Sequence, residues 1–144
     1  MKLLFVNANL HGHINPTLGL VKKLTARGHQ VSYFCAAPFA AQVQQAGAVW
    51  IGYSDEMERF LKAYRPTDRH PFFTLLEYML LYEEAVLPEA LDIIRANAFD
   101  MILCDAYFGG GVFLERLADL PVVISHPTFA TRHAPVPQPT SRAD

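Results

Sequence analysis

Five short apolar runs divide the chain, and they do not alternate apolar with polar residues. Continuous apolar runs of this length are typical of strands that are covered on both faces of a parallel sheet. Stretches with helical periodicity separate them, as in chains that alternate strand and helix. We therefore predict an α/β fold with an open parallel sheet and helices on both of its faces. The predicted strands span residues 3–8, 30–36, 48–52, 100–105 and 121–126.

The first helix is predicted from its end signals and its apolar stripe. Asn15 is a candidate N-cap, and Pro16 suits the first helical position because the N–H that proline lacks has no partner there. Gly28 is expected to end the helix in a left-handed conformation. The next helix has the same signals, with Pro38 at its start and Gly47 at its end. The inward stripe of the first helix consists of Leu18, Val21 and Leu24.

A longer insert, from Ser54 to Ala98, separates the third and fourth predicted strands. Residues 72–96 are predicted as one long helical region that Pro88 interrupts or kinks. This region has more aromatic side chains than a single packing stripe of a helix needs. They either cover the core or line an apolar ligand pocket. These aromatic residues are Phe72, Phe73, Tyr78 and Tyr82.

Composition and charge narrow the class of protein. With 12 basic and 14 acidic side chains, the chain offers no electrostatic case for binding nucleic acid or an anionic membrane. No apolar segment approaches the roughly 20 residues that span a bilayer. The N-terminus lacks the features of a signal peptide, so we expect a cytoplasmic protein. Cys35 and Cys104 lie in apolar runs and are predicted to be buried free thiols rather than a disulfide or a metal pair.

Two segments are predicted along the chain. Residues 1–131 hold all five apolar runs and are expected to form one domain. Residues 132–144 carry three prolines and no periodicity. They are expected to be an unstructured tail or a cut linker.

An imidazole follows the first strand directly. Open α/β sheets keep their chemistry at the carboxyl ends of the strands, and His11-Gly12-His13 lies there. A histidine in such a turn can be a general base, a metal ligand or a phosphate contact. Asp105 ends the fourth strand, which neighbours the first in a 3-2-1-4-5 order, so it should emerge beside His13. Its carboxylate can orient the ring, and it can also cap the following helix, predicted over about Tyr107 to Ala118.

Other kinds of site have less support in the sequence. The first turn has neither a Gly-x-Gly-x-x-Gly pattern nor a Walker-type loop, so dinucleotide binding is unsupported. His11 and His13 could chelate a metal, but no further ligand cluster accompanies them, and we predict no metal site. Ser125 is not in a nucleophile-elbow context. Gly109–Gly111 either approach a ligand or allow tight packing of a helix on the sheet, the interpretation we favour.

Two segments near the N-terminus resemble the opening of bacterial macrolide-type glycosyltransferases, of the UDP-glycosyltransferase superfamily and GT-B fold. They are His11-Gly12-His13-Ile14-Asn15-Pro16-Thr17-Leu18 and Leu24-Thr25-Ala26-Arg27-Gly28-His29-Gln30-Val31-Ser32-Tyr33. Residues 99–105 and 117–123 are similar to later parts of the same family, so the resemblance covers about residues 1–130. It implies a Rossmann-like sheet that is the N-terminal, acceptor-binding half of a GT-B architecture.

The resemblance also implies roles for individual residues. His13 would be the general base that deprotonates an acceptor hydroxyl, which then attacks a nucleotide sugar with inversion, and Asp105 would be its partner. The acceptor would be a hydrophobic, hydroxylated small molecule, and no metal or cofactor is implied. The nucleotide sugar, such as a UDP- or TDP-sugar, would be a co-substrate bound mainly by a second domain. Candidate substrate contacts are His11, Gly12, Phe72, Tyr78, Tyr82, Thr128 and Phe129.

The chain departs from the family in its length. A GT-B enzyme has two Rossmann-like domains, so we expect little or no transferase activity from this chain alone. It could be a fragment, a truncated product or half of a split enzyme. It would then pair with a separate donor-domain chain or self-associate through exposed apolar surface. Two alternatives stay open: a non-catalytic module that binds an apolar ligand or a partner, and an unrelated flavodoxin-like domain.

Overall fold

The fold is built around a five-stranded parallel sheet. The computed structural model describes residues 1–65, 70–108 and 110–126. The strands follow the order β3-β2-β1-β4-β5, and every neighbouring pair is parallel, which confirms the prediction. The strands are β1 (Lys2–Val6), β2 (Gln30–Phe34), β3 (Val49–Ile51), β4 (Met101–Asp105) and β5 (Val122–Ser125).

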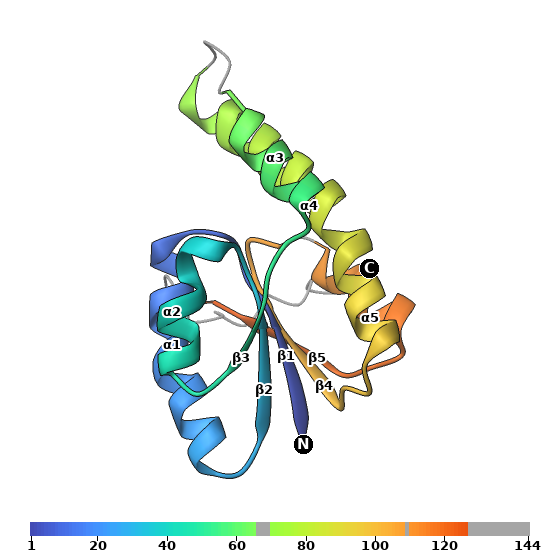
Figure 1. Cartoon of the computed structure of the whole chain (residues 1–144). Helices are drawn as coiled ribbons and strands as arrows, with labels where there is room; N and C mark the ends of the chain where they lie inside the picture. The colour runs from blue at the N-terminus through green and yellow to red at the C-terminus, as the bar shows by residue number, and fades with distance from the viewer. Residues whose placement is uncertain (66–69, 109, 127–144) are drawn as a thin grey trace, which may run out of the picture.

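Helices cover both faces of this sheet, as predicted (Figure 1). α1 and α2 lie on one face, and α5 lies with the C-terminal half of α4 on the other. α3 and the N-terminal half of α4 run side by side and project beyond the carboxyl ends of the strands; we call them the α3–α4 hairpin. The helices are α1 (His11–Ala26), the 3-10 turn η1 (Ala37–Phe39), α2 (Ala40–Gln45), α3 (Asp55–Ala63), α4 (Pro71–Ala96) and α5 (Gly111–Ala118).

Helix α1 begins about one turn earlier than predicted. The carbonyl of Leu10 accepts hydrogen bonds from the N–H groups of His13 and Ile14, so the first turn has already formed there. Pro16 consequently lies inside the helix and Asn15 is not the N-cap. Pro16 has no N–H to donate to the carbonyl four residues earlier, which is that of Gly12. Gly12 is exposed, so water can bond to this carbonyl instead. His13 therefore belongs to the first helical turn rather than to the preceding loop.

Two further helix boundaries differ from the sequence prediction. α4 continues through Pro88 as a single helix, so this proline does not interrupt it. α5 begins at Gly111 instead of near Tyr107. The residues in between form a separate turn, in which the N–H of Phe108 bonds to the carbonyl of Asp105.

Gly28 and Gly47 follow the ends of α1 and α2, as predicted, and both have positive φ angles, of 82° and 93°. At Gly28 the chain closes a Schellman motif, because the next N–H, of His29, bonds back to the carbonyl of Leu24. The two positions differ in their surroundings. A Cβ at Gly47 would lie 3.0 Å from Oγ1 of Thr25, whereas a Cβ at Gly28 would meet nothing within 4 Å.

Backbone conformation and the space around each glycine should therefore decide how much an alanine substitution changes the stability of the fold. Gly19→Ala, within α1 and with open space around it, should stabilise the fold by up to about 1 kcal/mol through helix propensity. Gly28→Ala should cost about 1–2 kcal/mol because of its left-handed backbone. Gly47→Ala should cost about 3 kcal/mol, since the steric contact adds to the same strain. Urea unfolding measures all three, and equal losses at Gly28 and Gly47 would contradict the predicted contact.

Both cysteines are buried free thiols, as predicted. Cys35 and Cys104 lie at the carboxyl ends of β2 and β4, with no accessible surface. Burial raises the pKa of each thiol to about 12, because the thiolate would lose its hydration in the apolar core. The folded state therefore favours the neutral thiol.

This burial predicts slow thiol chemistry and a loss of stability at high pH. Iodoacetamide at pH 8 should leave both cysteines unmodified in the folded chain and alkylate both in denaturant, as counted by mass spectrometry. Above the ordinary thiol pKa of about 8.5 the unfolded state loses protons that the folded state keeps. The free energy of unfolding should consequently fall as the pH rises from there toward 12. Rapid native alkylation of either cysteine would be inconsistent with the burial.

Candidate functional site

The structure brings His13 and Asp105 together at the carboxyl edge of the sheet. Nδ1 of His13 lies 2.9 Å from Oδ2 and 3.1 Å from Oδ1 of Asp105. His13 is 5% exposed and Asp105 is 0% exposed. The register explains the meeting, because β1 and β4 pair with Val6 opposite Cys104, and both strands end at this level. The juxtaposition predicted from the strand order is therefore present.

A second donor holds the carboxylate of Asp105. The backbone N–H of Tyr107 donates to Oδ1 at 2.7 Å. The ring of Tyr107 also packs edge-on against the ring of His13, with the centroids 4.4 Å apart. Asp105 thus anchors the turn after β4, whereas the N-cap position of α5 belongs to Gly110. Asp105 therefore caps this turn and does not cap helix α5.

This geometry makes Nε2 the available nitrogen of His13. A carboxylate accepts a hydrogen bond only from a protonated Nδ1, so the neutral ring carries its lone pair on Nε2. If Nε2 then takes a proton, the buried carboxylate stabilises the resulting imidazolium. Such an arrangement is suited to removing a proton from a hydroxyl group.

The N-terminal turn of α1 also holds two of the predicted substrate contacts. His11 is exposed, and its ring packs edge-on against that of Phe39 with the centroids 4.8 Å apart. Gly12 is exposed as well. Thr128 and Phe129 lie outside the residues that the structure describes, and so do residues 132–144.

The aromatic residues of α4 divide between surface and core. Phe72 is 57% exposed, near the start of the helix. Tyr78 is half-buried, and its ring stacks on that of Tyr82 with the centroids 6.0 Å apart. Tyr82 is only 3% exposed, so protein surrounds it and a direct contact with substrate is closed to it in this structure. The aromatic residues of this one helix therefore serve different purposes. Those near the sheet cover the core, and those on the hairpin form exposed aromatic surface.

Two residues of this region were not predicted from the sequence. Asn7 follows β1, and its Nδ2 donates to the backbone carbonyl of His13 at 3.1 Å. The sequence held an indication of its role, because Asn7 is a polar residue within an otherwise apolar predicted strand. Tyr107 covers the ring of His13, and only its position two residues after Asp105 could have pointed to it.

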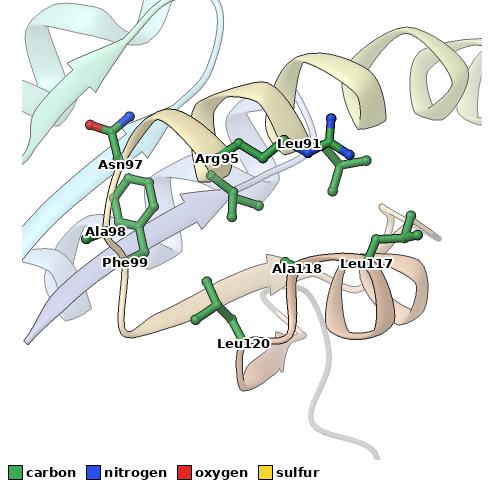
Figure 2. Close-up of a pocket in the computed structure, with 9 residues that line it drawn as sticks. Leu91, Arg95, Asn97, Ala98, Phe99, Leu117, Ala118 and Leu120 are labelled. Atoms are coloured by element: carbon green, nitrogen blue, oxygen red, sulfur yellow. The ribbon is translucent and has the colours of Figure 1, made fainter.

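A cavity of about 240 Å³ lies between the end of α4 and α5 (Figure 2). Phe99 directly precedes β4 and Leu120 lies between α5 and β5, so the cavity is at the amino ends of the strands. The candidate site at His13 is at the opposite ends. Typical small-molecule sites have volumes of about 300–1,000 Å³, and this cavity is smaller.

The glycine run before α5 serves packing in its described part. A Cβ at Gly111 would lie 2.9 Å from Cδ1 of Ile124 and 3.0 Å from Sγ of Cys104. The absence of a side chain therefore lets α5 approach the sheet closely, as we favoured. Gly109 lies outside the described residues.

Two features are absent from residues 1–65, 70–108 and 110–126. No group of three or more His, Cys, Asp or Glu side chains is placed there to hold a metal ion. No helix of these ranges combines the length and the apolar character that crossing a membrane requires.

Comparison with known proteins gives a consistent set of relatives, although no known protein-family profile matches the sequence. The chain is similar to demethyllactenocin mycarosyltransferase from Streptomyces fradiae, with 32% identity over 128 residues, which are 83% of this chain and 28% of that protein. It is also similar to NDP-glycosyltransferase YjiC from Bacillus subtilis, with 30% identity over 122 residues, 82% of this chain and 30% of that protein.

Solved structures extend the likeness to the fold. CalG4, the calicheamicin glycosyltransferase, superposes with a TM-score of 0.67 and 30% identity, over 85% of this chain and 31% of its own. The glycosyltransferase SnogD from Streptomyces nogalater gives a TM-score of 0.70 and 26% identity, over 87% of this chain and 34% of its own. This chain thus spans about a third or less of each of these four proteins.

The Asp105 carboxylate predicts a definite tautomer for His13. In Asp105→Asn, Oδ1 can keep the bond from Tyr107, so the new amide N–H₂ faces Nδ1 and donates to it. The neutral His13 ring should then carry its proton on Nε2 instead of Nδ1. ¹⁵N NMR of histidine-labelled protein distinguishes the two forms, and the partly exposed His29, outside the candidate site, provides an internal control. A proton on Nε2 of the neutral ring in the unsubstituted chain would contradict the assigned hydrogen bond.

Proposed function

Because this chain belongs with the bacterial macrolide-type glycosyltransferases and matches their N-terminal part, we propose that it carries the general base of an inverting transferase. His13 is the base and Asp105 is the residue that orients it. The observation that carries the proposal is the buried hydrogen bond from Nδ1 of His13 to Asp105, which leaves Nε2 to accept a proton.

The proposed reaction moves one proton and exchanges one bond. Nε2 of His13 removes the proton of an acceptor hydroxyl as the hydroxyl oxygen attacks the anomeric carbon of the sugar. The bond from that carbon to the nucleotide diphosphate breaks, and the diphosphate leaves with the electron pair. Attack from the opposite side inverts the anomeric configuration. The Asp105 carboxylate stabilises the imidazolium until its proton is released to water.

The acceptor is proposed to be a hydrophobic small molecule with a free hydroxyl. The α3–α4 hairpin rises beyond the edge of the sheet that holds His13 (Figure 1). Its helix α4 exposes large apolar side chains, which an apolar acceptor could cover. The names of two similar proteins refer to demethyllactenocin and calicheamicin. The exposed apolar residues of α4 are Phe72, Phe73, Leu75, Leu76 and Leu80.

The donor is proposed to be a nucleotide sugar such as a UDP- or TDP-sugar, used as a co-substrate. This chain spans about 30% of the length of the curated relatives that it matches. We therefore assign most donor contacts to a second domain, in the same protein or in a separate chain. Sugar transfer then requires both parts.

A fusion tests the assignment of His13. The matching N-terminal part of NDP-glycosyltransferase YjiC is replaced by residues 1–126, and sugar transfer from a nucleotide sugar to hydrophobic, hydroxylated acceptors is followed by chromatography. His13→Ala should lower the turnover of this fusion by about 10²–10⁴-fold, the usual contribution of a general base. His29→Ala, at a partly exposed histidine just after α1 and outside the candidate site, should leave turnover unchanged and serves as the matched control.

Equal turnover by the His13→Ala fusion and its parent would contradict the assignment of His13 as the general base. Acceptor binding by the parent fusion without any transfer would instead support the alternative of a non-catalytic binding module. Affinity for the acceptor, measured by fluorescence quenching, separates these two outcomes.

A further inference from the structure

A buried side-chain amide ties the first turn of α1 to the end of β1. Asn7 is 1% exposed, and its Nδ2 donates to the backbone carbonyl of His13 at 3.1 Å. Its Oδ1 accepts no hydrogen bond from any residue that the structure describes. The side chain also interacts with the hydroxyl of Tyr33, and its bond to the carbonyl of His13 is the one that reaches the proposed base. A buried polar group is costly in an apolar core, so its retention here needs a reason.

The backbone carbonyl of Asn7 is held in turn by helix α4. The hydroxyl of Tyr82 donates to it at 2.9 Å. Tyr53 then contributes its own proton to the oxygen of Tyr82, because that oxygen has already used its single proton. Burial raises the pKa of Tyr82 well above its ordinary value, so the hydroxyl keeps the proton that it donates. Helix α4 is consequently linked to His13 through Asn7, whose backbone carbonyl accepts from Tyr82 and whose side chain donates to His13.

His13 is thereby fixed at two points, by two neighbouring strands. Asp105, at the end of β4, holds the ring, while Asn7, beyond the end of β1, holds the backbone. The parallel register of the two strands sets the distance between these anchors. Shifts of about 1 Å in a reacting group can cost two orders of magnitude in rate. A change at either anchor would move Nε2 relative to a bound hydroxyl.

We propose that Asn7 and Tyr82 are positioning residues that couple the α3–α4 hairpin to the base His13, an inference that rests on the proposed function. Neither residue touches the reacting atoms. Tyr82 shares helix α4 with the exposed Phe72, so an acceptor that displaces this helix also displaces His13. The hairpin then adjusts the base to the acceptor that it binds.

Matched tyrosine variants test the coupling. Tyr82→Phe removes one hydroxyl and keeps the ring, whereas Tyr64→Phe does the same just after α3, where the hydroxyl donates to the backbone carbonyl of Thr74 and not to Asn7. In the YjiC fusion, Tyr82→Phe should lower kcat about 10-fold with KM within twofold. Tyr64→Phe should leave kcat within twofold. Asn7→Leu, which removes the amide at similar volume, should lower kcat at least as much as Tyr82→Phe.

A second readout needs no activity. In the histidine-labelled 144-residue chain, Tyr82→Phe should shift the ring ¹⁵N signals of His13 and leave those of His29 in place, and Tyr64→Phe should shift neither. Unchanged His13 signals and unchanged kcat in Tyr82→Phe would overturn the coupling even where His13→Ala is inactive. Full activity of His13→Ala would overturn the proposed function instead. The two failures are therefore distinguishable.

Discussion

Parallel pairing of β1 with β4 is the constraint on which the site depends. Val6 lies opposite Cys104, so the two central strands end at the same level of the sheet. Asp105 is the last residue of one strand, and the first turn of α1 follows closely after the other. The hydrogen bond between Asp105 and Nδ1 of His13 is a direct consequence. A shift of the register by one residue would turn Asp105 to the other face of the sheet and separate the pair.

The buried Asn, His, Thr and Asp side chains of the described core gather at this edge, and the buried hydroxyls of Tyr53 and Tyr82 are linked to them through Asn7. The four buried polar or charged residues all lie at the end of β1, in α1 or at the end of β4, and each has a protein partner. Hydrogen bonds offset the cost of burying such groups and hold the bonded residues in one arrangement, although Oδ1 of Asn7 accepts none from the described residues. These bonds position the side chains at the edge of the sheet where the candidate site lies. The four residues are Asn7, His13, Thr17 and Asp105.

The sequence was sufficient for the sheet, because unbroken apolar runs mark strands that are buried on both faces. It was also sufficient for the pairing of His13 with Asp105, since strand order alone brings them to one edge. It failed at the start of α1, where Pro16 suggested a boundary but the Leu10 carbonyl already closes a turn. Helix α3 was not predicted, although Ser54 caps it by accepting from the N–H of Met57. The bond from Tyr82 to Asn7 joins residues 75 positions apart, and no local pattern encodes it.

The central claim is that Nε2 of His13 faces the hydroxyl that receives the sugar. A crystal structure of the YjiC fusion with a bound acceptor measures this directly. Our account predicts the reacting hydroxyl oxygen within about 2.6–3.2 Å of Nε2, with Nδ1 still bonded to Asp105. An acceptor hydroxyl held elsewhere, for example beside the exposed His11, with Nε2 turned to protein instead of ligand, would contradict it.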